Sequence, residues 1–142
     1  MSKIEIFEDL VCWQKSRLLV KEIYSVTYTD QFKNDYALKD QIRRAMISVM
    51  LNIAEGFGRR SHKEFKQFLF IAHGSIAEVQ SCLYIAMDLN YIQKEDFDKL
   101  YNKCTEVSKI ISGLIKSLKW LYTLHTLYTL YTLYTLYTLY TL

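Results

Sequence analysis

Six polar residues that could take part in acid–base chemistry lie in the middle of the chain. They are Gln41, Ser48, Asn52 and Glu55, followed further along by Ser75 and Glu78. The first four are seven, four and three residues apart, which places them on one side of a helix. No nucleophile or set of metal ligands accompanies them, so we predict a structural network that fixes the register of two helices. An enzyme that uses Asn52, Glu55 and Glu78 stays open as the alternative.

The sequence lacks the residue patterns that usually bind metal ions or nucleotides. Di-metal sites of helical bundles use Glu-x-x-His, and no glutamate here has a histidine three residues on. The phosphate loop, the dinucleotide fingerprint and the nucleophile elbow are also absent. Cys12, Cys82 and Cys104 lack CxxC spacing, so we expect buried thiols in a reducing cytosol. We therefore predict no enzyme activity, no metal and no cofactor.

Basic residues gather between positions 39 and 66, where seven lysines and arginines stand against three acids. The whole chain has a net charge of +3, so this stretch, at +4, carries the entire excess. Arginine at a tight turn suits phosphate contacts, and the following helix N-terminus offers free N–H groups. The predicted nucleic-acid-binding residues, for RNA or DNA, are Arg43, Arg44, Arg59, Arg60, Lys63 and Lys66. The alternative is an ordinary solvated surface.

The chain has no proline and four glycines, which favours a few long helices over a sheet with many turns. Apolar residues three and four apart predict helices over about 8–28, 38–55, 61–89 and 94–119. Short connections between them predict an all-α, antiparallel, up-and-down four-helix bundle over residues 1–120. The third helix also carries apolar residues off its main stripe, which indicates a subunit interface. They are Ile71, Ala77, Tyr84 and Ile85.

The predicted helices have recognisable ends. Ser61 followed by Glu64 forms a capping box at the start of the third helix. Gly56-Phe57-Gly58 should end the second helix, with glycine in the left-handed conformation. Asn90 should end the third helix in the same way, because asparagine tolerates positive φ. The polar stretch from Thr27 to Asn34 should be a loop.

Residues 121–142 repeat Leu-Tyr-Thr, with His125 once in place of tyrosine. A period of three fits neither a strand nor an α-helix, so the leucines form no constant apolar face. The segment is uncharged, and its threonine and tyrosine content argues against a membrane span. We predict a low-complexity tail that is disordered or extends the fourth helix. With a charged N-terminus that lacks a signal-peptide core, we expect a cytoplasmic protein without membrane contact.

The second predicted helix contains a distinctive sequence motif, and further matches to the same family pattern follow its order elsewhere in the chain. It is Gln41-Ile42-Arg43-Arg44-Ala45, then Ser48, then Asn52-Ile53-Ala54-Glu55-Gly56. Matches elsewhere are Phe7, Leu10, Trp13-Gln14, Phe65, Phe68-Leu69, Ala72, Gly74-Ser75, Glu78 and Leu89-Asn90-Tyr91-Ile92. This pattern, over about residues 5–118, resembles the bacterial four-helix-bundle proteins encoded in intervening sequences of 23S ribosomal RNA genes, also called S23 ribosomal proteins. The repeat has no counterpart in that family.

The resemblance implies a cytoplasmic four-helix bundle that assembles as a homopentamer and associates with nucleic acid. The accessory variability determinant of diversity-generating retroelements, which binds a reverse transcriptase and RNA, is similar as well. We therefore predict a non-enzymatic, homo-oligomeric RNA-binding or scaffold protein. The alternative is an accessory subunit that binds a protein, such as a reverse transcriptase, and has no direct role with nucleic acid.

Overall fold

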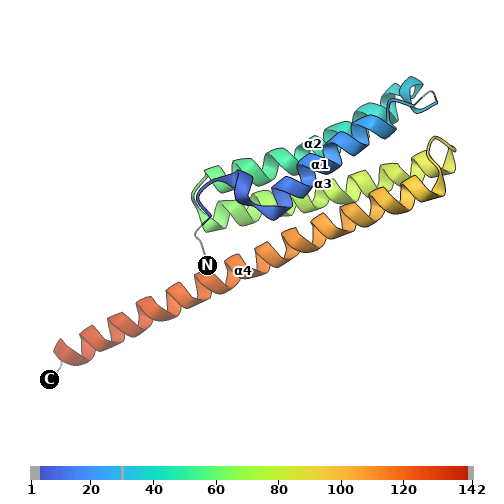
Figure 1. Cartoon of the computed structure of the whole chain (residues 1–142). Coiled ribbons are helices and arrows are strands. Elements are labelled where there is room, and N and C mark those ends of the chain that lie inside the picture. The colour runs from blue at the N-terminus through green and yellow to red at the C-terminus, as the bar shows by residue number, and fades with distance from the viewer. Residues whose placement is uncertain (1–3, 30, 141–142) are drawn as a thin grey trace.

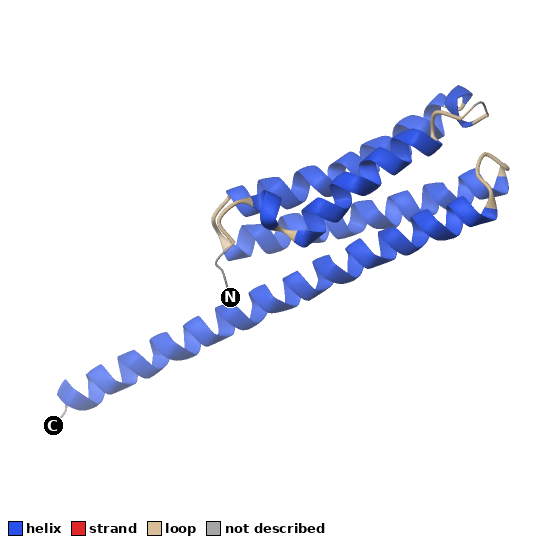
Figure 2. Ribbon diagram, viewed as in Figure 1, coloured by secondary structure: helices blue, strands red, loops and turns tan. Residues whose placement is uncertain are grey.

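The computed structural model describes residues 4–29 and 31–140 and contains four long helices. They are α1 (Val11–Val26), α2 (Tyr36–Gly58), α3 (His62–Asp88) and α4 (Lys94–Tyr140), with 3₁₀ turns η1 (Phe7–Asp9) and η2 (Phe32–Asn34) before α1 and α2. Consecutive helices run antiparallel, and α1 also packs on α4, which closes the bundle (Figure 1). Figure 2 shows helices and loops and no strand in the described residues. The prediction of an all-α up-and-down four-helix bundle is confirmed.

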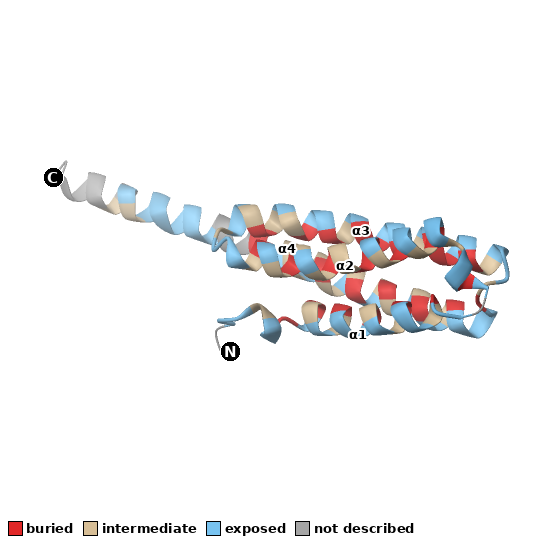
Figure 3. Cartoon of the chain, turned by 90° about the horizontal axis from the view of Figure 1, so that it is seen from above, coloured by how far each residue is buried: buried red, intermediate tan, exposed pale blue. Residues whose placement is uncertain are grey.

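Buried side chains lie where the helices face one another (Figure 3). The predicted stripes of α2, α3 and α4 supply most of them. Fully buried members are Ile42, Met46, Val49, Ile53, Leu69, Ile76, Val79, Leu83 and Ile111. Each such side chain contributes about 1.5–3 kcal/mol when it leaves water, so these stripes hold the bundle together.

The first predicted helix differs from the structure. Phe7–Asp9 forms a separate 3₁₀ turn, and Leu10 is extended before α1 begins. Apolar residues alone would also predict too wide a buried side for this helix, because Val11 and Leu18 are exposed to solvent. The buried stripe is narrower and includes a serine. Its members are Cys12, Ser16, Leu19 and Ile23.

The predicted loop from Thr27 to Asn34 contains a core residue that the pattern did not reveal. Phe32 is fully buried, and its ring centroid lies 5.4 Å from that of Tyr91. Thr27 is buried too, and its Oγ1 donates to the carbonyl of Ile23 at 2.7 Å. A single aromatic residue in a polar stretch has no periodicity, so sequence reasoning passed over it.

Helix ends follow the expected chemistry at two of the predicted positions. Ser61 Oγ accepts from the N–H of Glu64 at 3.4 Å, which confirms the N-cap of α3. Asn90 has φ 58°, as predicted for the residue after a helix end. A cap that was not predicted starts α2, where Asp35 Oδ1 accepts from the N–H of Leu38 at 3.0 Å.

The prediction for the end of α2 is wrong. Neither Gly56 nor Gly58 has positive φ, and the left-handed residue is Arg60, at φ 52°. Gly56 lies inside α2 where α3 crosses closely. A Cβ on it would lie 2.6 Å from Phe68 Cβ and 2.9 Å from Phe65 Cδ2. Glycine is therefore needed there for close helix packing and not for a turn.

α4 continues as a helix through the triplet repeat to Tyr140 and leaves the bundle at the end that holds the α2–α3 turn (Figure 1). Leu124, Leu127 and Leu130 are each more than half exposed, because no other helix reaches them. Thr129 and Thr132 donate to carbonyls one turn earlier. Residues 141 and 142, the end of the predicted tail, lie outside the described residues.

Ion pairs join α1 to α4 along their shared edge. Glu22 accepts from Lys103 and lies 3.4 Å from Lys99 Nζ, while Lys15 Nζ lies 2.8 Å from Glu106 Oε1. Burial acts to raise the pKa of Glu22, but the hydrogen bond and charge of Lys103, together with Lys99, hold this pKa below its usual value.

Replacement of Gly56 by alanine should destabilise the bundle by about 1–3 kcal/mol, because the new methyl group overlaps Phe68 and Phe65. Gly58→Ala is the matched control, since nothing lies within 4 Å of its Cβ position. This control should be neutral or stabilising by up to about 1 kcal/mol. Urea unfolding followed by circular dichroism measures both. Equal effects of the two variants would contradict the close approach at Gly56.

Glu22→Gln should lower the free energy of unfolding at pH 7 by about 0.5–1 kcal/mol. A lowered pKa means that the glutamate stabilises the fold above its unfolded pKa and loses this effect as the pH falls. The difference between the natural protein and the variant should therefore shrink between about pH 5 and pH 3. Urea unfolding at each pH tests this, and a difference that grows on acidification would refute it.

Candidate nucleic-acid interface

The turn between α2 and α3 is short and presents cationic side chains at one end of the bundle. α2 ends at Gly58 and α3 begins at His62. The N–H of Arg60 donates to the carbonyl of Phe57 at 3.3 Å, and the left-handed φ of Arg60 reverses the chain. The sequence forms this turn because Ser61 immediately caps the next helix.

Four of the predicted basic residues come together at this turn, and we call them the basic turn: Arg59, Arg60, Lys63 and Lys66. Arg60 and Lys63 are exposed. Lys66 Nζ lies 5.9 Å from the ring centroid of Phe70. The first N–H groups of α3 add positive potential beside them. An anion at this end of the bundle would meet both charged side chains and backbone donors.

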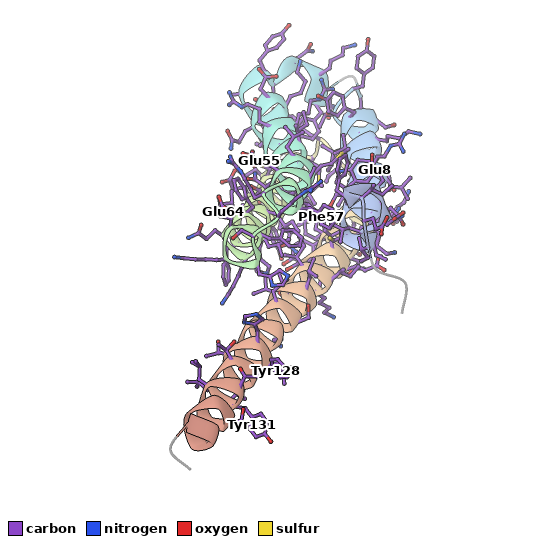
Figure 4. The ribbon with its side chains drawn as sticks, turned by 90° about the vertical axis from the view of Figure 1, so that its left-hand side faces the viewer. Glu8, Glu55, Phe57, Glu64, Tyr128 and Tyr131 are labelled. Atoms are coloured by element: carbon purple, nitrogen blue, oxygen red, sulfur yellow. The ribbon has the colours of Figure 1, made fainter. Side chains whose placement is uncertain are left out.

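Two carboxylates reduce the charge of the basic turn. Arg59 Nη2 lies 2.7 Å from Glu55 Oε1, and this hydrogen bond raises the pKa of Arg59. The guanidinium of Arg59 also lies over the Phe68 ring, 5.5 Å from its centroid. Glu55 belongs to α2 and Glu64 to α3, the two helices that the turn joins (Figure 4). Four cations against these two acids leave a local net charge of +2.

The other two predicted basic residues lie elsewhere. Arg43 and Arg44 precede Arg59 in α2 by 16 and 15 residues, which separates them from it by about 22–24 Å along the helix. Arg43 holds the end of α1, because its Nε donates to Thr27 Oγ1 at 2.8 Å and its guanidinium lies 4.4 Å from the Tyr24 ring centroid. A shallow pocket lies beside it, lined in part by Tyr24 and Tyr28. Arg44 is exposed and donates to Gln41 at 3.2 Å.

The polar set of α2 and α3 forms three separate local contacts. Ser48 Oγ lies 2.9 Å from Ser75 Oγ, and Asn52 Nδ2 donates to Ser48 Oγ at 3.0 Å. Gln41 Nε2 donates to Glu78 Oε2 at 3.3 Å, and this contact lies one to two helical turns from the Ser48–Ser75 contact. Glu55 instead pairs with Arg59 of the basic turn.

These contacts hold α2 against α3 and do not converge on one point. No carboxylate of the set faces a nucleophile there, so the arrangement offers no acid–base pair around a common ligand. Among residues 4–29 and 31–140 no group of three histidine, cysteine, aspartate or glutamate side chains is placed to hold a metal ion.

Sequence reasoning missed two polar contacts between α3 and α4. His73 Nε2 lies 2.9 Å from Ser108 Oγ, and Gln80 Nε2 donates to Thr105 Oγ1 at 3.1 Å. All four residues lie beside the apolar stripes of their helices, as Ser48 and Ser75 do. The same position beside a stripe could therefore have indicated these two contacts. The cysteines are buried as expected, and burial raises the pKa of Cys12 to about 11 and that of Cys104 to about 12. Thiols with such pKa values are not nucleophiles at neutral pH.

Comparisons with known proteins agree with the bundle. Residues 8–113 match the family model described as 23S rRNA-intervening sequence protein. The chain is also similar to the crystal structure of a protein of unknown function from the S23 ribosomal protein family of Bacteroides thetaiotaomicron. The two are 25% identical with a TM-score of 0.71, over 77% of this chain and 98% of that one. A comparison with curated proteins finds no match.

The Ser48–Ser75 contact should stabilise the pairing of α2 and α3. Ser75→Ala removes a partner from a nearly buried site and should lower the free energy of unfolding by about 1 kcal/mol. The double variant Ser48→Ala/Ser75→Ala should cost less than the sum of the single variants, because the two share one hydrogen bond. A double-mutant cycle in urea measures this coupling, and strictly additive losses would show that the serines act independently.

Proposed function

Since the chain belongs to the 23S rRNA-intervening sequence protein family, we propose that it is a non-enzymatic, homo-oligomeric scaffold that associates with RNA through the basic turn. The observation that carries this proposal is the set of Arg59, Arg60, Lys63 and Lys66 around the α3 N-terminus. Cationic side chains and outward N–H groups at one place are what a phosphate backbone binds.

The basic turn supports binding without sequence selectivity. Contacts to phosphates fix the position of a nucleic acid but carry no base information. A local net charge of +2 also gives weak binding for one copy of the chain. Several copies in one assembly would present the turn repeatedly, and the repeated contacts would raise the overall affinity.

Self-assembly is the second part of the proposal. Apolar side chains that remain exposed on α3 support it, because contiguous apolar surface on a small protein marks an interaction site. The family resemblance implies five copies, and the cytoplasmic location rests on the sequence alone. Both remain predictions.

An accessory subunit that binds a different protein is the second candidate function, and the same exposed apolar surface favours it. The two candidates differ in their need for RNA. Purification of one stoichiometric protein partner without RNA would favour the accessory subunit.

RNA binding should depend on the basic turn. For a fluorescent structured RNA, anisotropy titrations of the full chain should show affinity that falls log-linearly with salt. Arg59→Glu/Arg60→Glu should weaken binding by about tenfold or more at low salt. It should also reduce the magnitude of the slope of log affinity against log salt concentration by about 1–2.

Lys21→Glu/Lys109→Glu is the matched control, since it changes the net charge by the same amount at exposed positions on α1 and α4. It should change affinity much less. Equal losses in both variants would mean that only overall charge matters, and no binding by the natural chain at low salt would refute the RNA part of the proposal.

A further inference from the structure

The part of α4 that extends beyond the bundle is an uncharged helix with apolar side chains in solvent. Leu127 and Leu130 are each more than half exposed, and Tyr128 and Tyr131 project from the extension beyond the bundle (Figure 4). From position 120 to position 142 the sequence has no aspartate, glutamate, lysine or arginine. A helix of this composition is normally buried on most of its surface. The extension therefore lacks the partner that its composition requires.

The residues of the extension favour a strand over a helix. Tyrosine and threonine make up two thirds of the repeat; they are poorer helix formers than leucine and are enriched in strands. Thr129 Oγ1 donates to the carbonyl of His125 at 2.8 Å, and Thr132 Oγ1 donates to that of Tyr128 at 3.0 Å. Such bonds from a threonine to the preceding turn weaken a helix slightly. The bundle part of α4 supplies the helical nucleus, but each added triplet gains little stability.

A second helix cannot cover the extension evenly. Three residues turn an α-helix by about 300°, so each leucine points about 60° away from the previous one. The leucines return to their starting direction only after about six triplets, and every side of the helix carries the same mixture. Packing of two helices along their length needs an apolar stripe that repeats about every 3.5 residues. The triplet repeat does not provide one.

In a strand the same repeat becomes regular. Side chains alternate between the two faces, so each face carries leucine, threonine and tyrosine in a fixed order. An antiparallel neighbour with leucine opposite leucine also sets tyrosine opposite threonine, and such aromatic–β-branched pairs stabilise a sheet. A shift of three residues restores the same pairs, so many registers are equivalent. No charged residue of the repeat opposes the pairing.

The partner of such a strand must come from another copy of the chain. Pairing of the repeat with itself needs a tight turn, for which glycine, asparagine, aspartate or proline is used. None of these residues occurs from position 120 to position 142. The described part of the chain, residues 4–29 and 31–140, also contains no strand to which the repeat could add. The complementary strand is therefore the repeat of a second chain.

Antiparallel pairing also leaves room for the bundles. Neighbouring strands lie about 4.8 Å apart, whereas two helices side by side are about 20 Å wide. Antiparallel strands place successive bundles at opposite ends of the sheet. Shifts by one triplet, about 10 Å along a strand, stagger the bundles that lie on the same side. The equivalence of the registers thus removes the main steric obstacle to the sheet.

We propose that the uninterrupted repeat, residues 126–140, leaves its helix and forms an antiparallel β-sheet with the repeats of other copies. The ligand of this segment is thus an uncharged Leu-Tyr-Thr strand of the same chain. The main-chain hydrogen bonds of the helix are exchanged for bonds between strands, and the apolar side chains leave water in the sheet. The proposal goes beyond the proposed function, because it requires neither RNA nor the exposed side of α3.

Two sets of substitutions at the same threonines separate strand pairing from simple apolar association. Alanine at all four positions favours the helix, and valine favours the strand, whereas both replace the hydroxyl group by apolar surface. The valine variant should form the sheet at a concentration about threefold or more below that of the natural chain. The alanine variant should need a concentration about threefold or more above it. The four positions are Thr126, Thr129, Thr132 and Thr135.

The full-length proteins are compared over a concentration series. Thioflavin T fluorescence and the infrared amide I band detect an intermolecular sheet, and sedimentation velocity gives the mass of the soluble assemblies. Opposite shifts in the two variants would support the proposal. Easier assembly of both variants, or assembly without a sheet signal, would overturn it, because apolar contact between helices would then be sufficient. A natural chain that forms no sheet at any concentration would overturn it as well.

Seeding with peptides tests the role of the repeat itself. Sheets of a peptide with six Leu-Tyr-Thr triplets should shorten the lag before the full-length chain assembles, since a new strand can join in any of the equivalent registers. A peptide of the same composition in a shuffled order is the matched control and should act much less. Equal seeding by the two peptides would reject the pairing that depends on the three-residue period.

The measurements also separate this proposal from the proposed function. A soluble assembly of fixed mass without a sheet signal would overturn strand pairing and leave self-assembly through the bundles intact. A sheet that forms equally in the natural chain and in Arg59→Glu/Arg60→Glu would support strand pairing, whatever the RNA titrations of this variant show.

Discussion

The close approach of α2 to α3 at Gly56 sets the geometry of the end of the bundle that carries the basic turn. With no side chain at Gly56, Phe65 and Phe68 pack directly on the α2 backbone. The rings of Phe57 and Phe65 then meet edge to face, with centroids 5.9 Å apart. Helices this close leave room for only a short connection, which is why Arg60 adopts positive φ. The same packing places Phe68 under the Arg59 guanidinium.

α3 contributes to the bundle through one side and to the surface through the other. Its core side is fixed by close packing, in which adding or removing one methylene group changes the stability of the fold. Its outward side has no such constraint within the chain, yet it lacks the charges that usually fill a free surface. Polar contacts on both flanks, Ser48–Ser75 toward α2 and His73–Ser108 toward α4, fix the rotation of the helix. The apolar residues between these flanks must therefore face outward.

The helices, their order and most core residues could be predicted, because apolar spacing and caps are local properties of the sequence. Gly56 shows that the role of a residue can depend on contacts that are distant in the sequence. A glycine near a helix end fits a cap and a helix crossing equally well, and only the position of Phe68 decides for Gly56. The basic residues were predicted as one group, although the helix rise alone separates Arg43 and Arg44 from the turn. Phe32 lacks any periodic neighbour, and its burial depends on Tyr91, nearly sixty residues away in the chain.

The basic turn depends on how short the connection between α2 and α3 is. α2 ends at Gly58 and α3 begins at His62, so Arg59, Arg60 and Lys63 lie close to the first N–H groups of α3. A longer loop would hold the same side chains further from these donors. The close packing at Gly56 and the cationic character of this end of the bundle are therefore linked.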